Sequence, residues 1–261
     1  MLKAKLFSSR LKNTLVATGI TGEITAHNQA VNKMAIRQLL KLDPYFMFDI
    51  QVVKQAVKAG LSEDQVRTVM AQALGISPGR FVQEGPSYID PELTIHRLEQ
   101  MLDAVDQTIA AGRLILLATA HPGSMLKFYL TLENYIQRHR GRLFELAASI
   151  PLPRHQWADS VGGVVVISDL GSLLHDHGGQ AVEAVLGQVP GPQIGLVIAD
   201  HGMAGAAINA HIKTVGLHDV DDPGIPLAAH LGADVLAVPM NDNQLNLRTD
   251  HALTALIGDR D

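Results

Sequence analysis

The fold class of this chain can be predicted from one stretch of sequence, Leu196-Val-Ile-Ala-Asp-His-Gly-Met-Ala-Gly-Ala-Ala-Ile-Asn-Ala-His-Ile-Lys-Thr-Val-Gly-Leu217. It contains an apolar run at 196–199, a segment of helical character at 204–211 and a second run at 214–217. Strand, helix and strand in this order form a β-α-β unit, whose two strands lie parallel in one sheet. Apolar runs of this kind suit strands that are covered by helices on both faces.

The same alternation continues over residues 112–261. The expected strands span 114–119, 143–147, 164–168, 196–199, 214–217 and 235–238. The expected helices between and after them span 124–138, 180–188, 204–211, 224–231 and 249–257. This order predicts an α/β fold with a doubly wound, mostly parallel sheet of about six strands, since a closed eight-stranded barrel needs more repeats.

Residues 1–111 have a different pattern and predict an N-terminal helical region. Apolar residues between Val31 and Leu42 recur at intervals of three and four, and Asp90 followed by Pro91 is typical of a helix start. We therefore expect two parts, the helical region at 1–111 and a Rossmann-like α/β domain at 112–261. The N-terminal helices are expected to cover part of the sheet edge or to form the surface of a homodimer.

The composition limits the classes of function. Of the 261 residues, 47% are hydrophobic and 18% are charged, which is typical of a globular protein. A net charge of -5 without a cluster of Lys and Arg offers no surface for nucleic acid. The chain has no cysteine, so a metal would be bound by His, carboxylate or carbonyl groups. It also shows no signal peptide and no apolar run near the roughly 20 residues that span a bilayer, so we expect a cytoplasmic protein without a membrane partner.

Polar residues follow the first predicted strand, where ligands of open parallel sheets bind. Thr119, His121, Gly123 and Ser124 lie between this strand and the next helix. Backbone N–H groups and the positive end of the helix dipole would face an anion there, and the two hydroxyls could add donors. The alternative is a tight strand-to-helix turn in which Ser124 only caps the helix.

Two histidines follow the third predicted strand. His175 and His177 are two residues apart and share one face if the segment is extended. With Ser172 nearby, the segment predicts phosphate or metal binding. A surface loop with two solvated histidines is the structural alternative.

The fourth predicted strand ends in the strongest local candidate, Asp200-His201-Gly202. The carboxylate can bind a metal or act as a nucleophile, the imidazole can carry a proton, and the glycine permits a close backbone approach. Asp200 could instead merely cap the following helix, but a cap requires neither of its two neighbours.

Carboxylates also follow the last two predicted strands. Asp219, Asp221 and Asp222 repel one another, and a divalent cation is one remedy, besides solvent exposure and helix capping by Asp222. Asp242 follows the sixth predicted strand. Polar groups after five strands therefore point to one edge of the sheet.

These motifs together resemble a family of bacterial proteins, common in actinobacteria, that is generally labelled phosphatase. The resemblance runs from about Ile20 to the C-terminus. It rests on the segments 89–92, 119–123, 171–177, 199–202 and 219–223, taken in order. It implies phosphoester hydrolysis. The element Asp200-His201-Gly202 is also similar to one of the metal-dependent damage-control phosphatases, where such an element lies at the metal.

The leading hypothesis is a metal-dependent phosphatase acting on a small phosphorylated metabolite, with Mg²⁺, Mn²⁺ or Zn²⁺ as cofactor. The expected roles are Asp200, Asp219 and Asp222 as metal ligands, and Asp200 and His201 as catalytic residues. The expected substrate-binding residues are Thr119, His121, Gly123, Ser124, Ser172, His175, His177 and Gly202. The same edge could serve a phosphosugar or nucleotide binder, or an isomerase without hydrolysis. An oligomeric scaffold is the third alternative.

Overall fold

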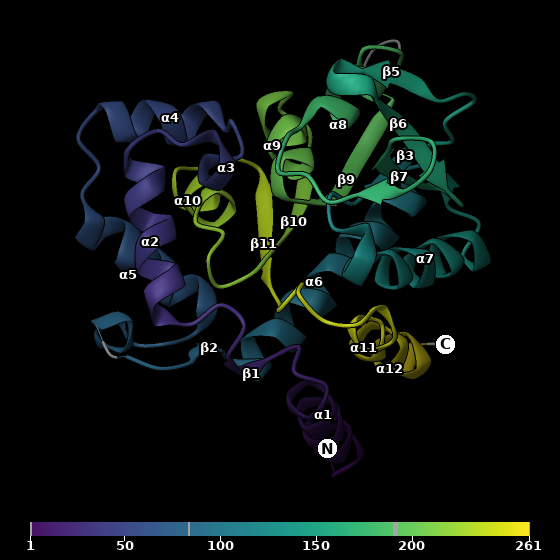
Figure 1. The fold of residues 1–261 in the computed structure, drawn as a ribbon. Helices are drawn as coiled ribbons and strands as arrows, with labels where there is room; N and C mark the ends of the chain where they lie inside the picture. Colours follow the sequence, from purple (N-terminus) through teal and green to yellow (C-terminus); the bar gives the residue numbers. More distant parts are fainter. Residues whose placement is uncertain (1, 83, 190–192, 261) are drawn as a thin grey trace.

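A computed structural model describes residues 2–82, 84–189 and 193–260, and Figure 1 shows its elements. Among these residues a nine-stranded sheet has the order β11-β10-β9-β3-β7-β6-β5, with β4 beside β3 and β8 beside β7. The strands are β3 Leu114–Ala118, β4 Arg142–Leu143, β5 Ile150–Leu152, β6 Gln156–Val161, β7 Val164–Ser168, β8 Leu173–Leu174, β9 Ile194–Asp200, β10 Thr214–His218 and β11 Val235–Pro239. A separate two-stranded sheet pairs β1 Gly22–Ile24 with β2 Ser87–Ile89.

Within the described residues six α-helices precede β3, and the later helices alternate with the strands of the large sheet. The helices are α1 Leu2–Ala17, α2 Gln29–Leu40, α3 Pro44–Met47, α4 Gln51–Lys58, α5 Glu63–Leu74, α6 Pro91–Ala110, α7 Pro122–Arg138, α8 Gln180–Leu186, α9 His201–Asn209, α10 Gly224–His230, α11 Asn246–Thr249 and α12 His251–Arg260. Short 3-10 turns span Pro78–Val82 and Pro153–His155. None of the helices in the described parts of the chain is both long and apolar enough to cross a membrane.

The predicted fold class is confirmed, because β11, β10, β9, β3 and β7 run parallel with helices on both faces. Side chains of β9 alternate between those faces. Leu196 and Ile198 join the core under α6, α7 and α12, whereas Val197 and Ala199 join the core under α8, α9 and α10. Burial on both faces explains why this strand is apolar throughout.

The sheet departs from the expected six strands in two places. The predicted strand at 143–147 is wrong beyond Leu143, because β4 pairs only with Leu114 and Ile115, and β7 occupies the rest of that β3 edge at Leu117 and Ala118. The antiparallel strands β5, β6 and β8 were not expected. A Gly162-Gly163 turn joins β6 to β7, with Gly162 at φ +62°, the conformation that tight hairpins favour.

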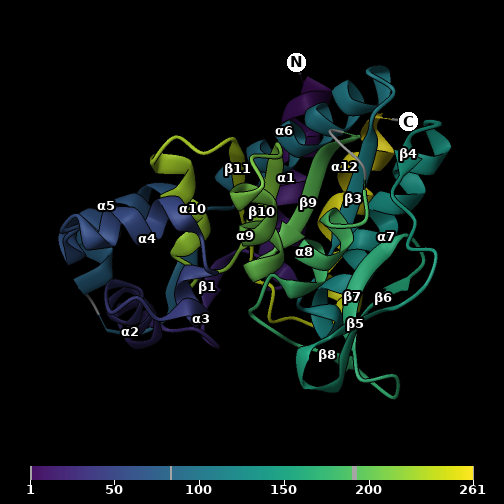
Figure 2. The ribbon, with the colours of Figure 1, turned by 90° about the horizontal axis from the view of Figure 1, so that it is seen from above.

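Among the N-terminal helices, α1 and α6 pack with α7 and α12. The helices α2 to α5 lie beside the sheet's β11 end, and Figures 1 and 2 place α2, α4 and α5 on the opposite side of the molecule from β5 and β6. Their apolar side chains share one core with α8, α9 and α10. The expected cap of α6 is present, since the Asp90 carboxylate accepts a hydrogen bond from the Glu92 backbone N–H. The division at residues 111 and 112 stays a prediction.

Candidate metal and phosphate site

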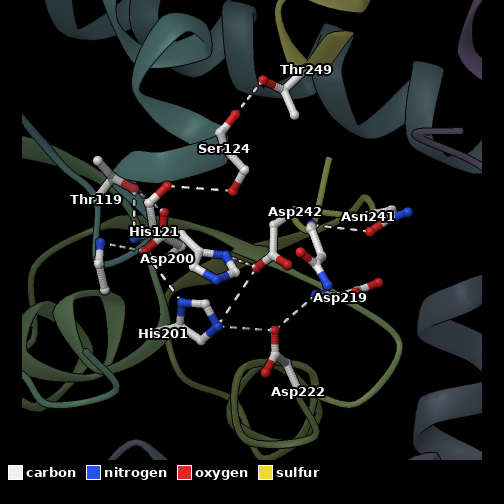
Figure 3. Close-up of polar contacts among 12 residues, drawn as sticks. Thr119, His121, Ser124, Asp200, His201, Asp219, Asp222, Asn241, Asp242 and Thr249 are labelled. Atoms are coloured by element: carbon white, nitrogen blue, oxygen red, sulfur yellow. Dashed lines mark hydrogen bonds and ion pairs between the residues drawn. The ribbon is translucent and has the colours of Figure 1, made fainter. Parts of the chain in front are cut away.

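Adjacent strands bring the polar segments to one edge of the sheet. Since β3, β9, β10 and β11 are neighbours and run parallel, their carboxyl ends meet, as Figure 3 shows for the side chains that follow them. Asp200, His201, Asp222 and Asp242 are all buried there. Burial of so many ionisable groups in one place is costly unless they are paired or bind a cation.

The carboxylate of Asp200 is fully buried and fully hydrogen-bonded. Its Oδ2 atom accepts from the Thr119 hydroxyl at 2.6 Å and the Tyr129 hydroxyl at 3.1 Å. Its Oδ1 atom accepts from the Ala120 backbone N–H at 2.6 Å and lies 3.5 Å from His201 Nδ1. Because each carboxylate oxygen has about two acceptor positions, these contacts leave little capacity for a further ligand.

His201 lies at the centre of the site, at the first turn of α9. Its φ of +46° lies in the left-handed region, which non-glycine residues rarely adopt. The ring's Nε2 atom lies 3.6 Å from an oxygen of Asp222 and 3.6 Å from an oxygen of Asp242. Burial alone would lower the pKa of His201, but the carboxylates of Asp222 and Asp200 outweigh burial and raise this pKa to about 10.

Asp222 and Asp242 face His201 from the segments that follow β10 and β11. Burial raises the pKa of Asp222, whereas His121 and His201 more than offset burial at Asp242 and lower its pKa. The Asp222 carboxylate also accepts a hydrogen bond from the Asp219 backbone N–H at 2.9 Å. The Asp222 carboxylate is thus held in place, and both carboxylates face the imidazole.

Three further histidines lie beside this group. The ring centre of His121 lies 3.9 Å from that of His175, and the ring centre of His177 lies 4.3 Å from that of His201. Burial lowers the pKa of His175 to about 4 and that of His177 to about 3. These two rings are therefore neutral at neutral pH and can bind a metal or accept a proton.

A separate ion pair ties the N-terminal region to the sheet. His27 Nδ1, in the segment between β1 and α2, lies 2.6 Å from the Asp219 carboxylate and 3.0 Å from that of Asp221. Hydrogen bonds that the His27 ring donates to the Asp219 and Asp221 carboxylates raise the pKa of His27 to about 11. The charged imidazole thus compensates two of the three carboxylates that follow β10.

Within the described residues, three groups of side chains bring potential metal-ligand atoms within 4.8 Å of one another. They are His121, His175 and His201; His201, Asp222 and Asp242; and His27, Asp219 and Asp221. His121, His175, His201, Asp222 and Asp242 also line a cavity of about 210 Å³. Buried atoms of this lining without a hydrogen bond include His121 Nδ1 and Asp242 Oδ2. Imidazole nitrogens and carboxylate oxygens left unpaired around a small cavity fit a divalent cation.

The structure distributes the residues predicted as metal ligands over different positions. Asp222 belongs to the group around His201, and Asp219 belongs to the group around His27. Asp200 lies behind His201 and belongs to neither group. The predicted ligand set is thus not gathered around one point.

The residues predicted to bind substrate also separate. His121, His175 and His177 line the cavity of about 210 Å³. Thr119 is buried against Asp200, and the Ser124 hydroxyl lies 3.5 Å from the His121 carbonyl at the start of α7, where Gly123 is exposed.

Two of the predicted residues have a structural explanation. Ser172 is exposed in the turn between β7 and β8, where its backbone N–H donates to Asp169, and it does not line the cavity. A Cβ at Gly202 would lie 2.2 Å from the His177 carbonyl oxygen, so this glycine permits the close approach of the segment that carries His177.

Sequence reasoning missed several residues of the site. Asp242 follows the last strand of the parallel sheet, so the strand-end rule could have included it among the predicted ligands. His27 and Tyr45 line the cavity from the N-terminal region, where neither residue had been assigned to the site. The spacing of Tyr129 in α7 predicts only a side chain on the apolar face of that helix. Its hydrogen bond to Asp200 in the structure is what connects it to the site.

Two comparisons with known proteins each match almost the whole chain. The family model described as Phosphatase matches residues 7–257. The protein named Phosphatase SCO2771, from Streptomyces coelicolor, is 29% identical over 255 residues, which cover 95% of this chain and 94% of that protein. The matched segment contains every side chain of the cavity.

Proposed function

The chain belongs to the Phosphatase family, and from this premise we propose that it hydrolyses phosphate esters of small molecules with the help of a divalent metal ion. One observation carries the metal requirement. His201, Asp222 and Asp242 are buried with ligand atoms within 4.8 Å of one another. A bound cation would compensate the two carboxylates at this point.

In this proposal His201, Asp222 and Asp242 bind the metal, and Asp200 orients His201 from behind. A metal-binding histidine usually directs its other ring nitrogen to a carboxylate, which fixes the orientation of the ring. The pair of His201 Nδ1 and Asp200 Oδ1, at 3.5 Å, supports this arrangement, with Nε2 facing the two other carboxylates. His201 thus takes the ligand position first expected of Asp200.

A mixed set of imidazole and carboxylate ligands favours Mn²⁺ or Zn²⁺ over Mg²⁺, which prefers oxygen ligands and retains several waters. When bound, the metal would polarise a phosphate oxygen and lower the pKa of a water molecule. His121, His175 and His177 line the same cavity, so their nitrogens can hold phosphate oxygens or carry protons. The N-terminus of α7 follows His121 directly and adds the positive end of a helix dipole.

The test combines metal analysis with phosphate release. The purified protein is assayed with p-nitrophenyl phosphate and a panel of phosphorylated metabolites, with Mg²⁺, Mn²⁺ or Zn²⁺ and after chelation. We expect release by the wild type that depends on metal, and loss of both metal and activity in Asp242→Asn.

A second variant separates the ligand from the positioning residue. Asp200→Asn should lower metal affinity by about 10- to 100-fold, as is typical for partners of metal-binding histidines, and retain activity when the metal is saturating. Asp234→Asn, an exposed carboxylate at the opposite end of the sheet, is the matched control. Metal-independent phosphate release, or full metal content in Asp242→Asn, would contradict the proposal.

A further inference from the structure

A second, larger pocket adjoins the metal-ligand cavity. It has a volume of about 530 Å³ and shares Tyr45, His175 and His177 with the cavity of about 210 Å³. We call the smaller one the inner cavity and the larger one the outer pocket. Pockets for small molecules typically measure roughly 300–1,000 Å³, so the outer pocket has the size for a metabolite, whereas the inner cavity suits a phosphoryl group.

The walls of the outer pocket come from two distant parts of the chain. Tyr45 and Asp49 belong to the N-terminal region, and Arg154 and Gln180 belong to the α/β part. The Tyr45 ring stacks on His177 with ring centres 3.5 Å apart and planes 14° apart. The His177 Nδ1 atom also lies 3.1 Å from the Tyr45 carbonyl oxygen. The boundary between the two pockets is therefore a fixed aromatic wall.

Arg154 is the cationic residue of the outer pocket, apart from its histidines. It lies in the turn between β5 and β6, where it and His155 adopt φ values of +62° and +58°. Two consecutive left-handed residues without glycine are unfavourable, and such strain often marks functional sites. Within the described residues the Arg154 guanidinium forms no hydrogen bond or ion pair, so its five donors are available to a ligand.

The acidic residues of the pocket limit where an anion can bind. Asp176 accepts a hydrogen bond from the Gly178 backbone N–H at 2.5 Å, and Asp49 lines the wall contributed by the N-terminal region. These carboxylates repel an anion but accept hydrogen bonds from hydroxyl groups. A ligand that fits this wall has hydroxyl groups, with its negative charge confined to the Arg154 side.

We propose that the outer pocket binds the part of the substrate that carries the phosphate ester, and that Arg154 selects hydroxyl-rich phosphate esters with a second anionic group. This inference rests on the proposed phosphatase function, because it places the scissile phosphate in the inner cavity. Arg154 pairs with the second anion through a planar guanidinium, which matches the oxygens of a phosphate or carboxylate.

The test compares a hexose 1,6-bisphosphate with the corresponding hexose 6-phosphate on the metal-loaded protein. Arg154→Gln should raise KM for the bisphosphate by about tenfold, a value typical of one lost hydrogen bond to a charged group, with kcat unchanged. KM for the monophosphate should stay within twofold. Arg140→Gln is the matched control, because Arg140 is also exposed at a positive φ of +58° and lines neither pocket.

The outcomes separate this inference from the proposed function. Equal KM changes for both sugars, or none for the bisphosphate, would overturn the role of Arg154. If the wild type releases no phosphate from either compound, both are titrated into the metal-loaded protein by calorimetry. Weaker bisphosphate binding by Arg154→Gln alone would then support the anion site without hydrolysis. Bisphosphate affinity that is unchanged in the variant, or undetectable in the wild type, would overturn the site.

Discussion

At the amino ends of β9 and β10 lies a pocket of about 590 Å³, whereas the inner cavity at the carboxyl ends of the same sheet measures about 210 Å³. Arg113, His211, Lys213 and Asp234 line the amino-end pocket together with apolar residues. The wall of the inner cavity instead contains the buried His201, Asp222 and Asp242 and four less buried histidines. In the described part of the chain, the groups of side chains suited to a metal all lie at the carboxyl end.

This difference shows that pocket volume does not locate the chemistry of the molecule. The larger pocket holds its charged groups at the surface, where water and dissolved salt screen their charges. The smaller cavity removes its groups from water, so their charges act strongly on one another and perturb their pKa values. The cavity with the buried groups lies at the carboxyl ends of the strands, because the helices that follow the strands begin there.

The largest expected effect comes from replacing a histidine at the carboxyl end of the sheet, compared with the same replacement at the amino end. His201→Gln should lower phosphate release by at least about 100-fold, because the variant loses a metal-binding nitrogen and affects the site more than an outer partner would. His211→Gln should retain activity, although His211 also has a positive φ, of +55°, and lies in the amino-end pocket. The measurement is kcat/KM together with the amount of bound metal. Equal losses in both variants would contradict the location of the chemistry at the carboxyl end of the sheet.

A pH titration of stability tests the burial of a histidine at the carboxyl end of the sheet. His218 is fully buried at the carboxyl end of β10, and burial lowers its pKa from 6.5 to about 4. Above pH 6.5 both folded and unfolded states are neutral, so His218 contributes no pH dependence. Below pH 6.5 only the unfolded state gains the proton, and the folded state loses stability until the pH reaches the folded pKa.

For the metal-free protein, this loss amounts to about 2 kcal/mol between pH 6.5 and pH 5. Chemical denaturation at both pH values should therefore show that His218→Asn loses about 2 kcal/mol less stability than the wild type. A stability difference between His218→Asn and the wild type that does not change with pH would contradict the buried, neutral state of His218.

The smallest expected effect separates two tyrosines of the same helix. Tyr129 donates to Asp200 at 3.1 Å, and Tyr135 donates to Asp106 at 2.8 Å. Removal of either hydroxyl should lower the free energy of unfolding by about 1 kcal/mol. Tyr129→Phe should additionally weaken metal binding by about tenfold, because Asp200 would orient His201 less firmly. Tyr135→Phe should leave metal affinity unchanged in the same titration.

The amino-acid sequence was sufficient to predict the α/β class and the edge of the sheet that carries the candidate site. Local patterns suffice for both, since an apolar run, a glycine or a helix cap is encoded by adjacent residues. The approximate bounds of β3, β7, β9, β10 and β11 follow from such patterns. The Gly162-Gly163 hairpin was equally local, and recognition of its turn would have identified β6.

Which polar groups come together depends on the packing of the sheet. The order β11-β10-β9-β3 brings Asp242, Asp222 and His201 together, although Asp242 lies 41 residues after His201 in sequence. The same contacts place Asp200 behind His201 and bring His27 to Asp219 across 192 positions. Such groupings depend on long-range packing of apolar faces, and each polar residue type by itself is equally compatible with a cap, a solvated loop or a ligand.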